Sequence, residues 1–395
     1  MVYVLSGRRT PIGRYGGTFR DTHPADLGAA ASRAAIEDAR VSPELVDEVV
    51  VGHARQAGSG PNPARQVGRR AGLPDQVTAH TVNKACASSL EALAHAARTI
   101  TLGEADIVLA GGIESMSRMP YLIDAADARW GHKMGSFPLV DAMYRDGFTC
   151  SVSGMVMGET AELVAREYSI SREVSDAFAF GSQQKAASAA RDGAFASELA
   201  PVTVPGPKGP LTLSADEHPR ADTTLESLAR LAPTFSLDGT PGIITPGSAS
   251  GITDGGAALV LASARAVDRH GLTPIARISG WASAGVDPRR MGIGPVPAVR
   301  RLLEQLGLSL EDFDLVELNE AFAPQVLAVL KDLPIPDDKL NVHGGAIALG
   351  HPIGATGARI VVTLIHALRR RGLKRGLATL CVSGGLGMAM AVEIV

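Results

Sequence analysis

Residues 80–86 read His-Thr-Val-Asn-Lys-Ala-Cys and place a cysteine between a predicted strand and a predicted helix. The run at 80–82 is typical of a buried strand, and apolar side chains recur at helical spacing from Ala87 to Leu102. A second strand, Ile107–Ala110, follows this helix and is expected to end at Gly111-Gly112. Further strands and helices precede this stretch: Val2–Ser6, Pro24–Ala39 and Glu48–Val51. This alternation predicts an α/β fold in which helices cover a largely parallel sheet.

The last third of the chain repeats this plan. Residues 42–51 read Ser-Pro-Glu-Leu-Val-Asp-Glu-Val-Val-Val, and residues 309–318 read Ser-Leu-Glu-Asp-Phe-Asp-Leu-Val-Glu-Leu, with a helix expected before each. Further on, a glycine-rich loop leads into a helix expected at 357–370 and a strand at 378–382. That order matches the helix and strand that follow Cys86. We therefore expect two copies of one βα unit.

The segment between the copies differs in composition. Glycine, proline and polar residues interrupt the alternation, and only two helices stand out, Gly158–Tyr168 and Arg172–Arg191, with Ser171 as the N-cap of the second. Insertions on a rigid α/β frame commonly supply substrate contacts. We expect an N-terminal domain of residues 1–117 and 251–268, an inserted lobe of residues 118–250, and a C-terminal domain of residues 269–395.

The composition of the chain excludes several classes of protein. The chain has 395 residues, 45% of them apolar, which predicts a globular protein with more than one domain. A net charge of −3 without long like-charge runs argues against nucleic-acid binding. We expect no membrane span, signal peptide or peroxisomal address, and hence a cytoplasmic protein. The three cysteines have neither disulfide nor zinc spacing, so we expect no metal.

Two cysteines lie where predicted strands meet loops. Cys86 comes just before a helix, whose unpaired N–H groups lower a thiol's pKa and favour the thiolate. Position alone fits a buried structural cysteine equally well. Cys381 leads into Ser383-Gly384-Gly385, a bend whose backbone amides can stabilise an oxyanion. Both cysteines are therefore candidates for covalent or acid–base chemistry.

Two further junctions carry polar side chains. Asn319 follows the predicted strand Leu315–Leu318, and His351 lies in the glycine-rich loop at 341–354, where His343 is its competitor. The carboxyl ends of parallel strands meet at one edge of a sheet, where ligands bind. We therefore expect Asn319 and His351 to lie near the two cysteines.

These segments together resemble the thiolase family over nearly the entire chain. Eight stretches match the family in the right order, which makes the resemblance specific. They are Arg9–Gly13, Asn83–Ser88, Gly111–Ser117, Met157–Glu162, Ser250–Gly255, Asn319–Phe322, Gly344–Arg359 and Cys381–Gly387.

The resemblance implies a thiolase fold, in which two duplicated βα halves form a layered α-β-α-β-α sandwich with an inserted loop domain. It implies an acyltransferase of fatty acid metabolism that condenses acetyl-CoA with an acyl-CoA, or cleaves a 3-ketoacyl-CoA with CoA. Coenzyme A thioesters would be the substrates, and no cofactor would be needed. The family also implies a homodimer or homotetramer, with the loop Tyr121–Asp146 as the expected assembly element.

The resemblance also implies roles for single residues. Cys86 would carry the acyl group as a thioester after activation by His351. Cys381 would act as the acid and base on the α-carbon of acetyl-CoA. A water held by Asn319 would complete one oxyanion site with His351, and the amides of Cys86 and Ser383 would form the other. The expected contacts to CoA and to the acyl or pantetheine end are Arg220, Ser227, Ser250, Met157, Met291, Ala321 and Phe322.

Three positions depart from the family pattern. Ser89 and Ser383 stand where the family usually has glycine, and either side chain can narrow the pocket. Val156 stands where short-chain enzymes often have histidine, which leaves the acyl-chain length open.

Three other classes of protein remain as alternatives. A decarboxylating ketoacyl-synthase-like enzyme would lack Cys381 in its glycine bend. A non-catalytic CoA or lipid binder would not need the four catalytic side chains. A papain-like hydrolase has a cysteine and a histidine in unrelated motifs.

Overall fold

The computed structural model describes residues 1–206 and 208–395, and its centre is a mixed ten-stranded sheet. The strands of this sheet are β1 (Val2–Arg9), β2 (Gly13–Arg14), β3 (Glu48–His53), β4 (Thr78–Val82), β5 (Ile107–Ser115), β12 (Thr253–Ser263), β13 (Ala276–Gly285), β14 (Leu315–Leu318), β15 (Arg375–Val382) and β16 (Leu386–Ile394). They pair in the order β14-β15-β16-β13-β1-β12-β5-β3-β4, and β2 pairs with β12. The two halves of the chain thus supply the two sides of one sheet.

The prediction of a largely parallel sheet is wrong. Parallel ladders join β3 to β4 and β5, and β14 to β15. The neighbours at the centre, from β5 through β12, β1 and β13 to β16, run antiparallel, as do β15 and β16. The alternation of strands and helices along the sequence indicates only the parallel pairs of strands, because a parallel pair needs a helical crossover between its strands. By contrast, β15 returns to β16 through a tight turn, and β5 returns to β12 through the inserted lobe.

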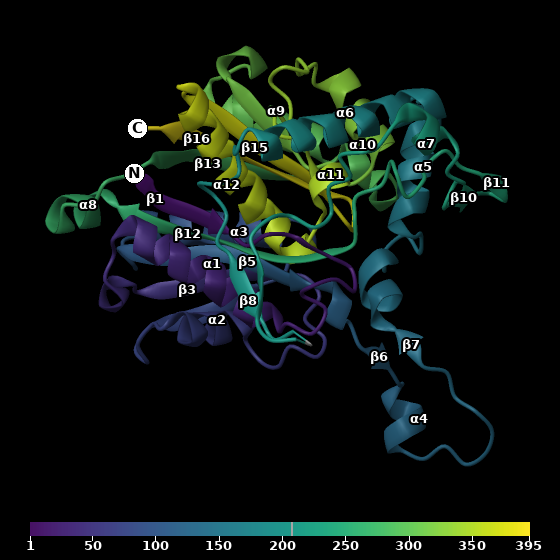
Figure 1. The fold of residues 1–395 in the computed structure, drawn as a ribbon, viewed down its shortest axis with the longest axis horizontal. Coiled ribbons are helices and arrows are strands. Elements are labelled where there is room, and N and C mark those ends of the chain that lie inside the picture. The colour runs from purple at the N-terminus through teal and green to yellow at the C-terminus, as the bar shows by residue number, and fades with distance from the viewer. Residues whose placement is uncertain (207) are drawn as a thin grey trace.

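Helices and sheet halves stack in five layers (Figure 1). The middle layer holds α3 (Ser88–Leu102) and α12 (Ile353–Arg371), whose apolar residues share one core with both halves of the sheet. Helices α1 (Pro24–Ala39) and α2 (Pro63–Ala71) pack on the N-terminal half, and α9 (Pro295–Leu306) and α10 (Ala323–Asp332) pack on the C-terminal half. The α-β-α-β-α sandwich expected from the resemblance is confirmed.

The two halves repeat the same order of elements. Short 3-10 turns, η1 (Pro43–Leu45) and η5 (Leu310–Asp312), precede β3 and β14 in the stretches that the repeat predicted. In the second half, Leu340 makes only an isolated parallel bridge to Val316, where β4 forms a full ladder with β3. The segments after β4 and after Leu340 each lead into a central helix. The duplication therefore brings the loops of Cys86 and His351 to the same end of the middle layer.

Two element boundaries differ from the prediction. Strand β5 does not end at Gly111-Gly112 but continues to Ser115. A Cβ at Gly112 would overlap the carbonyl oxygen of Gly354 and the Cβ of Ser89, so glycine here lets β5, α3 and α12 approach closely. Helix α12 begins at Ile353 rather than at residue 357, which puts His351 just before its first turn.

The segment between β5 and β12 consists of helices and short hairpins. Its long helices are α5 (Met157–Glu167) and α6 (Arg172–Arg191), and the hydroxyl of Ser171 caps α6 by accepting from the amide of Val174 (3.4 Å), as predicted. The smaller elements here are η2 (Met116–Arg118), β6 (Tyr121–Leu122), α4 (Ala125–Arg129), β7 (Val140–Asp141), the π-helical turn η3 (Tyr144–Phe148), β8 (Val202–Val204), β9 (Leu211–Leu213), α7 (Leu225–Ala229), β10 (Ser236–Leu237) and β11 (Thr240–Pro241). Figure 1 shows that the part around α4 projects from the body. Beyond β12 lie α8 (Ala264–His270), η4 (Pro288–Ile293) and α11 (Ala346–Leu349).

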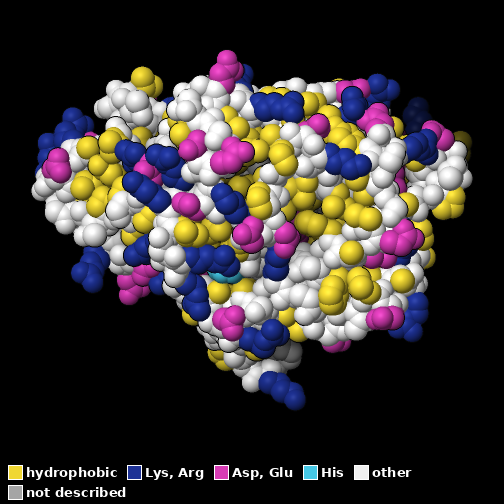
Figure 2. All heavy atoms as spheres, turned by 90° about the horizontal axis from the view of Figure 1, so that it is seen from above, with side chains coloured by type: hydrophobic (Ala, Val, Ile, Leu, Met, Phe, Trp, Pro, Cys, Tyr) yellow, Lys and Arg dark blue, Asp and Glu magenta, His cyan; other side chains and the backbone are white. Residues whose placement is uncertain are grey.

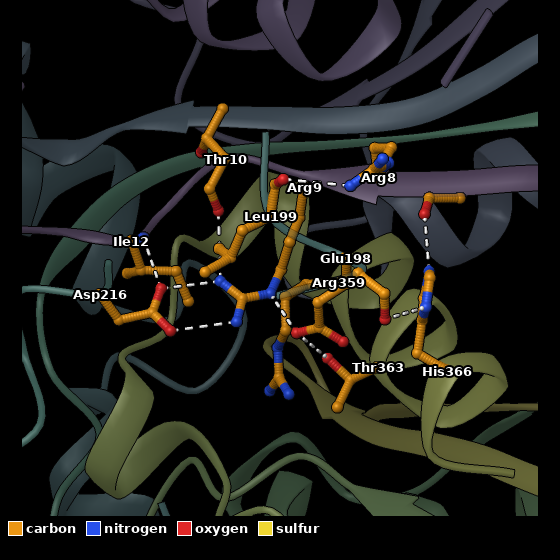
Figure 3. Close-up of polar contacts among 12 residues, drawn as sticks. Arg8, Arg9, Thr10, Ile12, Glu198, Leu199, Asp216, Arg359, Thr363 and His366 are labelled. Atoms are coloured by element: carbon orange, nitrogen blue, oxygen red, sulfur yellow. Dashed lines mark hydrogen bonds and ion pairs between the residues drawn. The ribbon is translucent and has the colours of Figure 1, made fainter. Parts of the chain in front are cut away.

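Buried charges tie this segment to the middle layer (Figure 3). Arg9 of β1 is fully buried and forms ion pairs with Glu198 (2.6 Å) and Asp216 (2.7 Å). Glu198 also accepts a hydrogen bond from Thr363 of α12 (3.2 Å). These contacts join a strand, the inserted segment and a central helix. Removing one partner would leave a buried charge uncompensated, which typically costs about 3–5 kcal/mol.

The surface carries mixed charge. On the face that Figure 2 shows, acidic and basic side chains are interspersed with hydrophobic ones. Within residues 1–206 and 208–395, no helix is both long and apolar enough to cross a membrane.

Candidate active site

The turn between β4 and α3 holds Cys86. Ala85 has a left-handed backbone (φ 44°), which is unusual for a residue with a Cβ. The side chain of Asn83 accepts from the amide of Ala85 (3.0 Å), and the hydroxyl of Ser88 donates to the carbonyl of Ala85 (2.7 Å). The same hydroxyl accepts from the amide of Lys84 (2.9 Å). Neighbouring side chains therefore stabilise the strained turn that fixes Cys86 in front of α3.

Burial decides the protonation of Cys86. It raises the pKa of the thiol, while the charge of Arg55 and a hydrogen bond from the backbone amide of Ser383 act to lower it. The prediction that the helix N-terminus gives a lowered pKa is wrong, because burial outweighs the opposing influences. Cys86 therefore rests as a thiol at neutral pH and needs a base before it can attack.

His351 is a neutral base with one free nitrogen. The hydroxyl of Thr356 donates to the carbonyl of Pro352 (2.9 Å), so it must accept from Nδ1 of His351, 2.6 Å away. This assignment from the hydrogen-bond network leaves Nε2 without a proton. Nε2 is buried and has no hydrogen-bond partner among the described residues. Burial, helped by the charges of Arg359 and Arg55, lowers the pKa of His351 to about 3.

Cys381 lies beside Cys86 at the end of β15. Burial and the proximity of Cys86 raise the pKa of the Cys381 thiol far above its usual range. Gly384 (φ 88°) and Gly385 (φ 82°) then turn the chain back, a conformation that favours glycine. This bend brings the amide of Ser383 to the sulfur of Cys86. Two thiols and one backbone donor thus meet at the same place.

Asn319 follows β14, as predicted. Its backbone amide donates to the carbonyl of Thr379 (3.0 Å), while both polar atoms of its buried side chain lack partners in the described part of the chain. The adjacent Glu320 differs, because it accepts from Asn341 (2.9 Å) and Ser182 (2.7 Å). Glu320 therefore holds the loop, and the Asn319 amide keeps its hydrogen-bonding capacity for a ligand or a water.

Most of the predicted substrate contacts lie around Cys381. One apolar cluster contains Cys381 together with Met157, Met291, Ala321 and Phe322. The amide of Ser250 donates to the carbonyl of Ala321 (2.9 Å), which brings this residue to the same cluster.

The other two predicted contacts lie farther out. Arg220 is exposed, and its amide donates to the side chain of Gln183 (2.9 Å). Ser227 belongs to the first turn of α7 and bonds with Thr224, where its amide donates to the threonine hydroxyl (3.1 Å). Among residues 1–206 and 208–395, no hydrogen bond links Arg220 or Ser227 to the cluster around Cys381.

A buried group of polar and charged side chains, two of which act on Cys86, had no role in the sequence analysis. Glu114 of β5 accepts from the amides of Gly354 (2.9 Å) and Arg55 (3.2 Å), and it lies 3.1 Å from Nε2 of His53. Glu114, His53 and Arg55 lie at the carboxyl ends of the parallel strands β3 and β5. Ligands commonly bind at the carboxyl ends of parallel strands, and this signal, which singled out Cys86, could also have found these three residues.

The chemistry of this arrangement is that of covalent acyl transfer. It offers a thiol, a neutral base whose loop reaches the same end of the middle layer, a second thiol, and amides that can stabilise an oxyanion. Outside residue 207, no group of three or more His, Cys, Asp or Glu side chains is placed to hold a metal ion. Fold and site together define a layered α/β enzyme of the acyl-transferring class.

The chain belongs to the thiolase family. Residues 2–265 match the family model for the thiolase N-terminal domain, and residues 272–394 match the model for the thiolase C-terminal domain. The acetyl-CoA acetyltransferase of Escherichia coli (strain K12) is 50% identical over 390 residues, covering 99% of this chain and 98% of that protein. The chain is accordingly an acyltransferase.

Solved structures agree with this membership. The crystal structure of the Bacillus anthracis acetyl-CoA acetyltransferase has a TM-score of 0.96 and 44% identity, covering 100% of this chain and 98% of that one. Human mitochondrial 3-ketoacyl-CoA thiolase in complex with CoA has a TM-score of 0.95 and 44% identity, with the same shares covered.

Proposed function

We propose that this acyltransferase condenses acetyl-CoA with an acyl-CoA, and cleaves 3-ketoacyl-CoA with CoA, through an acyl group carried on Cys86. The observation that carries the proposal is the neutral His351 with a free Nε2 in a site that also holds two adjacent thiols. The relatives support the substrate class, since their names refer to acetyl-CoA and 3-ketoacyl-CoA and one was solved with CoA.

Thiolysis begins with a proton transfer from Cys86 to Nε2 of His351. The thiolate attacks the 3-keto carbonyl, and the bond between the α and β carbons breaks. The acyl group stays on Cys86 as a thioester, while the electron pair leaves on the enolate of acetyl-CoA, which Cys381 protonates. The amides of Cys86 and Ser383 stabilise the tetrahedral oxyanion, and a water held by Asn319 stabilises the enolate together with protonated His351.

The second half removes the acyl group. Cys381, left as a thiolate, takes the proton of the CoA thiol, which attacks the Cys86 thioester. An acyl-CoA leaves, and protonated His351 returns the proton to Cys86. Condensation follows the reverse path, in which Cys381 takes the α-proton of acetyl-CoA. The strongly raised pKa of Cys381 suits it to return a proton to the enolate, since it is a thiol at neutral pH.

The remaining parts of the proposal concern substrate length and assembly. Arg220, Ser227 and Ser250 would contact CoA, and the apolar cluster around Cys381 would hold the acyl or pantetheine end. Val156 puts a short apolar side chain just before α5, which leaves the preferred chain length to experiment. We also propose the domain division at residues 117, 250 and 268, no resident cofactor, a cytoplasmic location, and a homodimer or homotetramer.

A thiolysis series tests the proposed function. The purified protein is assayed with CoA and 3-ketoacyl-CoA substrates from four to sixteen carbons, by loss of the ketoacyl absorbance. We expect turnover of at least one chain length, with one acetyl-CoA formed per 3-ketoacyl-CoA consumed, or two from the four-carbon substrate. Decarboxylation of malonyl-CoA without thiolysis would instead indicate a ketoacyl-synthase-like enzyme. Binding of CoA with neither reaction would indicate a non-catalytic binder.

A further inference from the structure

Arg55 carries a buried positive charge without an acidic partner. The residue follows β3, is only 7% exposed, and has a buried Nε with no hydrogen-bond partner among the described residues. Its guanidinium makes one hydrogen bond there, from Nη1 to the backbone carbonyl of Asp146 (3.2 Å). Buried guanidinium groups are normally paired with a carboxylate, because desolvation of an unpaired charge is costly.

The two acidic residues that contact Arg55, Glu114 and Asp146, direct their carboxylates elsewhere. The carboxylate of Glu114 accepts from the backbone amide of Arg55 and not from its guanidinium. It also accepts from the amide of Gly354 and lies close to Nε2 of His53. The carboxylate of Asp146 accepts from its neighbour Arg145 (3.3 Å). Within residues 1–206 and 208–395, the guanidinium of Arg55 therefore has only a neutral carbonyl to compensate its charge.

Apolar side chains lie beside both Arg55 and Cys86. Cys86 packs against an apolar cluster of Ala54, Met116, Met143 and Ile353, with Phe148 beside it. This cluster is separate from the one around Cys381, which gives the two thiols different apolar neighbours.

Arg55 follows Ala54 of that cluster directly and reaches the segment that carries Phe148. A Cβ on Gly147 would lie 2.8 Å from Nε of Arg55, so the guanidinium rests against this glycine. The charge of Arg55 acts on both Cys86 and His351. An acyl group on Cys86 that extends into the apolar cluster therefore passes close to a free cation.

We propose that Arg55 is a specificity-determining residue, which selects 3-ketoacyl-CoA substrates whose acyl chain ends in a carboxylate. This inference rests on the proposed function, since it needs the acyl group to be carried on Cys86. A carboxylate at the end of a short acyl chain would form a two-point ion pair with the planar guanidinium of Arg55 and accept from its free Nε. A methyl-ended chain of the same length leaves the charge unpaired.

Two six-carbon substrates test the inference, because they differ only at the far end. Thiolysis kcat/KM is measured for 3-ketoadipyl-CoA, which ends in a carboxylate, and for 3-ketohexanoyl-CoA, which ends in a methyl group. We expect the protein to prefer 3-ketoadipyl-CoA by at least about tenfold. Arg55→Met should lower this preference about tenfold or more, so that none remains, because one partner of a buried charge pair is removed.

Two further variants make the result specific. Arg55→Lys keeps the positive charge but loses the planar set of N–H donors, so it should retain part of the preference. Arg20→Met removes an exposed arginine of 66% accessibility and should keep the full preference. Should Arg55→Met fail to fold, the Arg55→Lys variant carries the test.

Three outcomes would overturn the inference. One is thiolysis of 3-ketohexanoyl-CoA by the protein with no preference for the carboxylate, which leaves the proposed function intact. Another is an equal fall for both substrates in Arg55→Met with a shifted pH profile of Cys86 alkylation, which assigns Arg55 to the thiol. The third is a full preference kept by Arg55→Met, or by Arg55→Lys where that variant carries the test. If the protein cleaves neither six-carbon substrate nor acetoacetyl-CoA, the proposed function itself fails.

Discussion

The protonation of His351 connects the packing of single residues to the chemistry of the site. Nδ1 bonds to Thr356, and burial keeps the ring neutral at any pH near 7. Both shifts favour the uncharged forms, because burial lowers the pKa of the imidazole and raises the pKa of the Cys86 thiol. At rest the base therefore stays free and the nucleophile stays protonated, and the proton passes to His351 only when a bound substrate stabilises the charges that the transfer creates.

The lowered pKa of His351 predicts a pH-dependent loss of stability. The pKa is about 3 in the folded protein and 6.5 ordinarily, so between these values only the unfolded chain binds the proton. The contribution is fully present above pH 6.5 and is lost as the pH falls toward 3. Between pH 7 and pH 5.5 it removes about 1.3 kcal/mol of unfolding free energy.

Denaturant unfolding of the protein and of His351→Asn, at equal protein concentration, measures this difference. The wild-type protein should lose stability relative to the variant as the pH falls from 7 to 5.5. Parallel pH dependence of the two proteins would show that His351 titrates normally in the fold.

At the scale of elements, α3 and α12 are the parts that bring the catalytic loops together. Ser89 joins them directly, because its buried hydroxyl accepts from the backbone amide of Ala358 in α12 (2.9 Å). Its Cβ also fills the space left by Gly112 of β5. The family usually has glycine at position 89, so in this chain the side chain adds a contact between the two central helices.

Truncation of Ser89 should therefore destabilise the middle layer. Ser89→Ala loses a buried hydrogen bond and should lower the unfolding free energy by about 1–2 kcal/mol. Ser89→Gly should lower it further, by about 1 kcal/mol, because glycine is a poor helix former. Thermal unfolding measures both, with Ser188→Ala, which loses only an exposed contact to Asp192, as a near-neutral control. Equal midpoints for all four proteins would contradict the role given to Ser89.

Many elements were predictable, because their periodicity is local. Helices α1 and α6 and strand β14 have the bounds that apolar spacing gave them. The direction of strand pairing was not predictable in the same way, since it depends on how the chain returns. The extension of β5 through Gly111-Gly112 depends on close packing against α12, which no local pattern records.

At the site, the sequence identified side chains but not their environment. Cys86, Cys381, Asn319 and His351 were found at the junctions of elements. The raised pKa of Cys86 was missed, because burial depends on layers contributed by distant parts of the chain. Arg55 was missed for a related reason, since an arginine after a strand looks like a surface residue until its neighbours are known.

At the scale of the whole molecule, the segment around α4 projects from the body (Figure 1). It exposes large hydrophobic side chains, including Trp130 (79%) and Met134 (90%). Exposed apolar groups of this kind mark interaction surfaces. We expect this segment to contribute to assembly of the homodimer or homotetramer.

The double variant Trp130→Ser, Met134→Ser should therefore form a smaller assembly than the wild-type protein. Light scattering after size-exclusion chromatography measures the mass of each. The variant with Val152→Ser, which alters an exposed side chain (69%) outside this segment, should keep the wild-type mass. An unchanged mass in the double variant would exclude these side chains from the interface.

The central claim is that Cys86 carries the acyl group and Cys381 handles the proton. Mass spectrometry of peptides after brief treatment with acetyl-CoA tests it most directly, in the wild-type protein and in Cys86→Ala and Cys381→Ala. We predict acetyl on Cys86 in the wild-type protein and in Cys381→Ala, none in Cys86→Ala, and no condensation by Cys381→Ala. Acetyl on Cys381, or full turnover by Cys381→Ala, would contradict the account.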